Sequence, residues 1–199
     1  NLKLEKSLAS FSTPNRLVVS YVLDIPVGKG RKYLANANGL VQGVLGGWGV
    51  QGVTTVQDGF PLHFGTNVNN TNSYGGGSRP NVIAGCQKSI SGSAQSRLAE
   101  WFNTSCFTAP PSFTFGDEGR TDPNLRGAGI ANWDFSAFKN FPIAPENRVN
   151  LQFRAEFFNL FNRVQFQFPN QTQGNPAFGT VTQQANLPRL VQFALRVNF

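Results

Sequence analysis

The strongest constraint on the fold is the alternation of apolar and polar side chains over the last ten residues, 190–199. From residue 191 onwards the odd positions carry Val, Phe, Leu, Val and Phe, and the even positions carry Gln, Ala, Arg and Asn. Side chains of a β-strand alternate between two faces, whereas a helix repeats every 3.6 residues. The segment is therefore predicted to be a strand with one apolar face and one mostly polar face.

Four further segments show the same period. In residues 149–159 the polar positions include Arg154 and Glu156, so this strand cannot be buried on both faces. Its apolar positions do not recur at three and four, which argues against a helix. The other predicted strands are residues 132–141, 16–25 and 47–57, the last weakened by glycines. Lys139 interrupts the apolar face of residues 132–141 near their end, where its long side chain is expected to reach water.

Weaker patterns lie between these strands. Residues 61–65 are expected to extend the sheet after a turn at Asp58-Gly59, and residues 2–11 are expected to form another strand. A tight turn is predicted within residues 142–148, at positions 144–147. One short helix is expected near residues 93–102.

The connections alternate between short turns and long loops rich in Gly, Asn, Ser and Pro, at about residues 66–130 and 163–188. This alternation is typical of outer-membrane barrels. Strands of about 9–11 residues match the length that crosses a bilayer at a tilt. The sequence therefore predicts an all-β antiparallel meander of about 6–8 strands, a β-barrel or barrel fragment with long external loops, as a single unit over residues 1–199. A soluble β-sandwich is the alternative.

Composition and charge support a surface that does not face water on all sides. Charged residues are 14% of the chain and aromatic residues 13%, against roughly 25% charged residues in soluble domains. The net charge is +7, but Lys29, Arg31 and Lys32 form the only tight basic group, so binding to nucleic acid is not expected. Arg154, Glu156 and Arg196 are predicted to face the lumen of the barrel.

The two cysteines, Cys86 and Cys106, lie in the first long loop. A disulfide between them would close a ring of about twenty residues and would imply an oxidising compartment. Two unpaired thiols are the alternative. No second Cys/His pair lies at ligand spacing, so no metal site is predicted from the cysteines.

No set of residues indicates catalysis. His63 is the only histidine, and a catalytic triad would depend on it. Asp117, Glu118 and Asp122 cluster in a loop with glycines; a calcium site there is an alternative, although the spacing matches no known calcium loop. The protein is therefore not expected to be an enzyme, and no cofactor or metal is expected.

Several segments resemble, in the same order, the end of the TonB-dependent outer-membrane receptors, especially the Oar-like type with a carboxypeptidase-regulatory-like N-terminal domain. The matching segments are Pro26-Val27-Gly28-Lys29-Gly30, Gly46-Gly47-Trp48, Asp58-Gly59-Phe60-Pro61, residues 132–141, residues 154–162, Phe178-Gly179-Thr180-Val181 and residues 192–199. The resemblance spans nearly all of the chain. The plug, the TonB box and the earlier strands are missing from this sequence, and full receptors close about 22 strands.

The resemblance implies that the chain is the C-terminal part of a receptor for nutrient uptake in the bacterial outer membrane. Phe199 would be the terminal aromatic residue that the assembly machinery recognises. The expected partners are the rest of the barrel, the plug and outer-membrane lipid. If the 199 residues are the whole mature chain, open strand edges predict instead a structural subunit that pairs with other copies of the same chain, as an extracellular filament or a small barrel.

Overall fold

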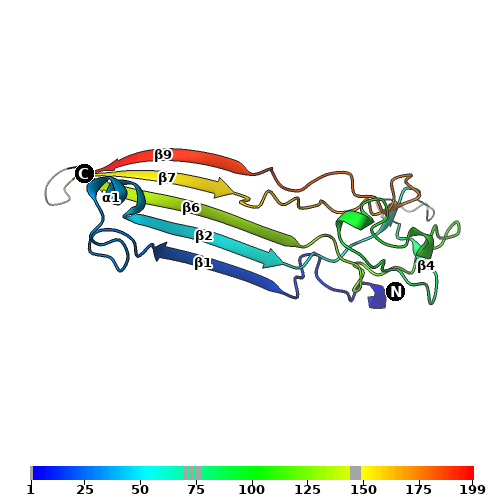
Figure 1. Ribbon diagram of the computed structural model, residues 1–199. Helices are drawn as coiled ribbons and strands as arrows, with labels where there is room; N and C mark the ends of the chain where they lie inside the picture. Colours follow the sequence, from blue (N-terminus) through cyan, green and yellow to red (C-terminus); the bar gives the residue numbers. More distant parts are fainter. Residues whose placement is uncertain (1, 70, 72–73, 75–77, 144–148) are drawn as a thin grey trace. The chain divides into compact units, whose positions relative to one another are not determined.

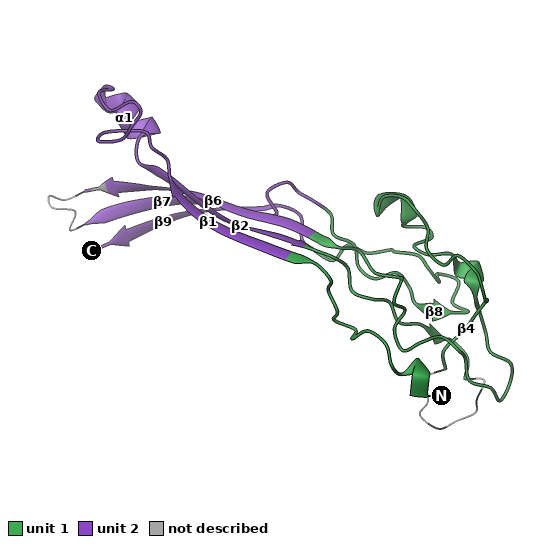
Figure 2. Cartoon of the chain, turned by 90° about the horizontal axis from the view of Figure 1, so that it is seen from below, with its two compact units in different colours: residues 1–16, 57–130, 164–186 green, residues 17–56, 131–163, 187–199 purple. Residues whose placement is uncertain are grey.

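The computed structural model describes residues 2–69, 71, 74, 78–143 and 149–199. The chain divides into two compact units, each assembled from three separate segments (Figure 2). Unit 1 contains residues 1–16, 57–130 and 164–186, and unit 2 contains residues 17–56, 131–163 and 187–199. In unit 1 the long connections form a core of their own; that residues 1–199 are a single barrel-type unit stays a prediction.

Unit 2 is built around a five-stranded sheet whose order, β1-β2-β6-β7-β9, is also the order along the chain (Figure 1). The strands are β1 (Arg16–Asp24), β2 (Trp48–Gln57), β6 (Ile130–Pro142), β7 (Asn150–Phe158) and β9 (Leu190–Asn198). These are the five strands that the alternation predicted, and the all-β meander is confirmed. Within the described residues the sheet is open, with β1 and β9 at its two edges.

The register of the sheet follows from the alternation. β7 pairs antiparallel with both β6 and β9, so that Phe153 lies between Lys139 on one side and Leu195 on the other. A shift by one residue would move every side chain to the opposite face. The observed register therefore keeps the apolar positions of neighbouring strands on one side of the sheet.

The connection between β1 and β2 contains a short helix, α1 (Gly39–Leu45), which the sequence did not predict. Asn38 caps its first turn, because the Asn38 side chain accepts a hydrogen bond of 2.9 Å from the backbone N–H of Val41. The helix contains two glycines, which are poor helix formers. Its position therefore depends on contacts with the sheet more than on local propensity.

Unit 1 has little regular secondary structure. Its elements are two pairs of two-residue strands, β3 (Gly65–Thr66) parallel to β8 (Thr172–Gln173) and β4 (Asn81–Val82) antiparallel to β5 (Phe107–Thr108), and the 3-10 helices η1 (Leu2–Leu4), η2 (Gln95–Arg97) and η3 (Thr104–Cys106). Its core contains four mutually packed rings, Phe64, Phe102, Phe107 and Phe178, whose centroids lie 4.5–6.2 Å apart. Tertiary packing, more than hydrogen-bonded ladders, stabilises this unit.

Some predictions for the connections were wrong. Residues 2–11 form no strand and begin with η1, and the helix expected near residues 93–102 is only the single turn η2. The chain does not turn at Asp58-Gly59 but continues beside the segment that precedes β6: the N–H of Leu62 donates to the carbonyl of Leu125 at 2.9 Å. Gly59 permits this, because a Cβ there would lie 1.9 Å from the carbonyl oxygen of Gly127. The turn predicted at 144–147 lies outside the described residues.

Candidate functional site

One face of the sheet in unit 2, called here the apolar face, carries hydrophobic side chains on successive strands, which are exposed on the edge strands and mostly half-buried between them. On β9 the side chains of Phe193 and Leu195 are 68% and 69% exposed. Register places them on the same side as the apolar positions of β7 and β6: Leu151, Phe153, Ala155 and Phe157 on β7, and Phe135, Ala137 and Phe141 on β6. An apolar surface of this extent is unusual on a protein surrounded by water and marks an interaction surface.

The apolar face continues over β2 and β1. Trp48 of β2 meets Phe153 edge-on at a centroid distance of 6.2 Å, and Leu17 and Leu23 of β1 are more than half exposed. Gly52 lets the Tyr21 ring lie against the sheet, because a Cβ at residue 52 would be 2.4 Å from the Tyr21 hydroxyl oxygen. The glycine that weakened the predicted strand therefore has a packing role.

The opposite face, called here the polar face, holds a network of hydrogen bonds. The Arg154 guanidinium lies 3.4 Å from a Glu156 carboxylate oxygen and 3.3 Å from the side-chain oxygen of Gln152. The Gln152 side chain donates to that of Asn140 at 3.0 Å, and Gln152 pairs with Arg196 in the β7–β9 register. The three residues predicted to face a lumen thus lie on one face, and their lumen role stays a prediction.

Lys139 is an exception on the apolar face. Its side chain was expected to reach water, but it is only 4% exposed. The ammonium group donates to the carbonyl of Gly43 in α1 at 2.5 Å and lies over the rings of Trp48 and Phe141, at 5.7 and 5.1 Å. The expectation was wrong because α1, which the sequence did not reveal, provides the carbonyl that binds this lysine.

Unit 1 contains the predicted disulfide. Cys86 and Cys106 are bonded, with their Cα atoms 5.6 Å apart, and Cys106 is fully buried in the aromatic core. The residue after Cys106 is Phe107, one of the four packed rings. The bond therefore links two distant segments at the centre of the unit, where it limits their separation when the chain unfolds.

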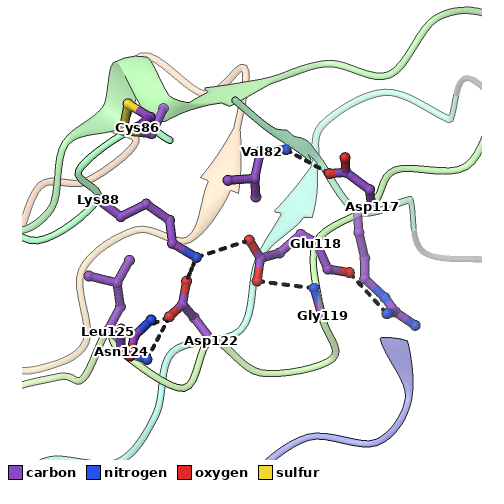
Figure 3. A network of polar contacts seen from close by, with 11 residues as sticks. Val82, Cys86, Lys88, Asp117, Glu118, Gly119, Asp122, Asn124 and Leu125 are labelled. Atoms are coloured by element: carbon purple, nitrogen blue, oxygen red, sulfur yellow. Dashed lines mark hydrogen bonds and ion pairs between the residues drawn. A yellow bond between two sulfur atoms is a disulfide. The ribbon is translucent and has the colours of Figure 1, made fainter. Parts of the chain in front are cut away.

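A buried network of polar contacts lies close to the disulfide (Figure 3). The Lys88 ammonium group forms an ion pair with Asp122, which is fully buried, and lies 3.7 Å from Glu118. The other Asp122 oxygen accepts hydrogen bonds from the backbone N–H groups of Asn124 and Leu125, at 2.7 and 3.0 Å. Lys88 thus occupies the space between two carboxylates that the sequence considered for calcium.

The third carboxylate of that cluster is separate from the network. Asp117 accepts a hydrogen bond of 2.7 Å from the backbone N–H of Val82 and so holds β4 in place. Burial raises the pKa of Glu118, the nearby Lys88 opposes this rise, and the charge of Asp122 adds to it. No group of three or more His, Cys, Asp or Glu side chains in the described residues is arranged to hold a metal ion.

Two other residues singled out in the sequence are exposed. His63 lies between the buried Leu62 and Phe64, and its backbone N–H donates to the side chain of Gln171 at 2.7 Å. Phe199 follows β9 and its side chain is fully exposed. Its role in assembly stays a prediction.

Sequence reasoning missed Lys88, α1 and the aromatic core of unit 1. One signal was available: aromatic residues lie beside the second cysteine, with Trp101-Phe102 before it and Phe107 after it. Side chains of this size next to a cysteine in a long loop indicate a packed core. Lys88 carried no such signal, because its partners Glu118 and Asp122 lie 30 or more residues away in the sequence.

Among the residues that the structure describes, no helix combines the length and the hydrophobicity that a membrane-spanning helix requires. In the comparison with protein families, residues 1–192 match the model described as an outer membrane beta barrel domain. Neither the search of curated proteins nor the search of solved structures found a match.

Proposed function

Because this chain belongs to the outer membrane β-barrel domain family, we propose that it supplies part of the wall and external loops of a TonB-dependent receptor for nutrient uptake. The family is located in the bacterial outer membrane. One observation carries the proposal: the sheet has a continuous apolar face on one side and a hydrogen-bonded polar face on the other. A barrel wall needs this division, because lipid contacts one surface and the interior contacts the other.

The polar face supports a lumen lined by the Arg154 network. A guanidinium group and a carboxylate in lipid would be costly, whereas facing a water-filled or plugged interior they remain solvated and paired. Arg154 is also positioned over the Phe138 ring, at 5.8 Å, which limits its freedom. We therefore assign Arg154, Glu156 and Arg196 to the interior surface.

The chain order supports external loops at one end of the strands. The segments of unit 1 precede β1, connect β2 with β6, and connect β7 with β9. In an antiparallel meander these connections all leave from the same end of the strands, whereas the short connection between β6 and β7, residues 143–149, leaves from the other end. Outer-membrane barrels place long loops outside and short turns in the periplasm, so unit 1 would meet the nutrient first.

Energy-coupled uptake can be tested in the source bacterium. We expect deletion of the gene for this protein, and separately of the gene for TonB, to abolish the depletion of the same compound from a defined medium, followed by mass spectrometry. Complementation with the wild-type gene is the control. If deletion of this gene changes no uptake while deletion of TonB stops the uptake of other compounds, the receptor proposal is wrong.

A self-assembling structural subunit is the second candidate. The observation that favours it is the open sheet: within the described chain, β1 and β9 each pair on one side only. Unpaired strand edges are templates for pairing with another copy. Negative-stain microscopy and intact-mass measurement of native material separate the two candidates. Regular filaments of a 21.7 kDa chain would favour the subunit, and single detergent-bound particles of a much heavier chain would favour the receptor.

A further inference from the structure

The connection between β1 and β2 gathers positive charge at one end of the sheet. Lys29, Arg31 and Lys32 fall within four positions, all three are exposed, and residues 25–47 contain no acidic residue. Arg31 forms an exposed ion pair with Asp24 at 3.3 Å. Among the described residues, this connection therefore carries three cations against the one neighbouring carboxylate of Asp24, which gives it a net positive charge.

The same connection exposes apolar side chains beside the cations. In α1 the side chains of Leu40, Val44 and Leu45 are 82%, 65% and 50% exposed. Tyr33 and Leu34, directly after the cations, are also about half exposed. Apolar and aromatic side chains next to basic residues are typical of segments that lie in the interface of a membrane.

α1 is joined to the apolar face by two hydrogen bonds. The indole N–H of Trp48 donates to the carbonyl of Val44 at 2.8 Å, and the ammonium group of Lys139 donates to that of Gly43 at 2.5 Å. Both donors belong to the sheet. The exposed side of the helix is therefore continuous with the surface that faces lipid, and a tryptophan lies at the boundary, as is common at membrane interfaces.

The cations are presented on a structured loop. The N–H of Gly28 donates to the carbonyl of Tyr33 at 2.9 Å, and the N–H of Tyr33 donates to the carbonyl of Pro26 at 3.0 Å. The Gln42 side chain donates to the carbonyl of Leu34 at 2.6 Å and so connects this loop to α1. Loop and helix form one surface, which lowers the entropy lost when a ligand binds.

We propose that residues 26–45 form a binding site for anionic phospholipids. Lys29, Arg31 and Lys32 bind the headgroup phosphates, and Leu40 and Val44 contact the upper part of the acyl chains. Phospholipid is the occupant because β6 and β7 are joined at this end by their short connection, and barrels place short connections on the periplasmic side. The inference rests on the location of the family in the outer membrane, so it would survive failure of the transport proposal.

The test uses the complete protein, isolated from outer membranes and placed in nanodiscs of equal phosphatidylcholine and phosphatidylglycerol. Lipid retained after mild delipidation is counted by mass spectrometry. Wild-type protein is expected to retain phosphatidylglycerol preferentially. The combined variant Lys29→Ser, Arg31→Ser, Lys32→Ser should lose that preference, by a factor of roughly five for each cation, which corresponds to about 1 kcal/mol per Lys or Arg near an anionic surface.

Two control variants make the result specific. Lys3→Ser, Lys6→Ser, Arg16→Ser removes the same charge from exposed positions elsewhere and should keep the preference. The second control variant, Lys29→Arg, Arg31→Lys, Lys32→Arg, retains the three positive charges and should also retain the preference for phosphatidylglycerol. Equal retention of both lipids by wild type, or unchanged retention by the serine variant, would overturn the proposal. So would stronger retention of lipid A than of phosphatidylglycerol in a parallel mixture, since lipid A belongs to the outer leaflet.

Discussion

At the scale of single residues, the arrangement that matters most for the stability of unit 1 is one lysine, Lys88, between two buried carboxylates. Asp122 is fully buried and Glu118 is 3% exposed, and both depend on Lys88 for compensating charge. Asp122 also receives two backbone hydrogen bonds, whereas one Glu118 oxygen has no hydrogen-bond partner. The two carboxylates are thus unequal: Asp122 accepts three hydrogen bonds, whereas Glu118 accepts one, from the backbone N–H of Gly119, and lies farther from Lys88.

Replacing Lys88 with methionine should destabilise unit 1 strongly. The variant keeps much of the side-chain volume but leaves two buried carboxylates without a cation, a loss typically of about 3–5 kcal/mol. Denaturant unfolding followed by the fluorescence of Trp101, which is buried in the same core, measures the change. Lys6→Met, at an exposed position of the same unit, should have little effect. Equal stability of the two variants would show that the network contributes nothing.

Glu118 should make the stability of unit 1 depend on pH. Because burial raises its pKa in the folded chain, the folded state binds the proton more tightly than the unfolded state. The protonated Glu118 side chain therefore contributes fully to the free energy of unfolding at pH values below the ordinary pKa of glutamate. This contribution is lost as the pH rises through the raised pKa of the folded state. Glu118→Gln should remove that loss, as seen in denaturant midpoints between about pH 4 and pH 8. Glu100→Gln removes the charge of an exposed carboxylate and is the control for the change in net charge. If the denaturant midpoints of wild type and Glu118→Gln depend on pH in the same way, the prediction is wrong.

At the scale of secondary-structure elements, the sequence predicted those features of the fold that depend on a local pattern of residues. The five long strands follow from period-two alternation, and Arg154 and Glu156 fall on the polar face by parity alone. α1 was missed because it is short, contains two glycines and is held by Trp48 and Lys139. Unit 1 was missed as a core because its contacts join segments far apart in the chain, with little alternation to reveal them. The signals in the sequence were the two cysteines and the aromatic residues beside Cys106.

A charge on the apolar face of β9 should prevent stable insertion. Leu195 lies opposite Phe153 and away from both ends of the strand, and a lysine on the lipid side of a barrel costs about 2–4 kcal/mol near the middle of the bilayer. Leu195→Lys is compared with Gln192→Lys, which places the same charge on the polar face of the same strand. Urea titrations of protein refolded into lipid vesicles should show the cost for Leu195→Lys only. A similar loss of stability in both variants would mean that the two faces of β9 do not differ in their contact with lipid.

At the scale of the whole molecule, the chain combines two kinds of stability. Unit 2 has an extended sheet that leaves many of its apolar side chains exposed, above all on its edge strands β1 and β9, and we expect lipid to cover them. Unit 1 encloses its own aromatic core around a disulfide. This difference fits a protein whose strands lie in a bilayer while its long connections fold in water.

Phe199 should affect assembly of the whole protein rather than its final stability. Its side chain is fully exposed beyond the edge strand β9, so removing it disturbs no packing within the described chain. Phe199→Ala is expected to lower the amount of protein in purified outer membranes relative to total protein, and Phe199→Tyr should preserve it. Unchanged assembly of the alanine variant would exclude Phe199 as the recognition signal.

The interleaving of the two units along the chain has a consequence for biogenesis. Val181 and Phe178, from the last segment of unit 1, pack against Phe64, Phe102 and their neighbours, more than 70 residues earlier in the chain. Contacts of such long range form slowly, because a large loop must close first. During export the aromatic cluster therefore stays incomplete until residues 178–181 have been translocated. Periplasmic chaperones would have to shield it through that interval, so truncated chains ending before residue 178 would be preferred substrates for quality-control proteases.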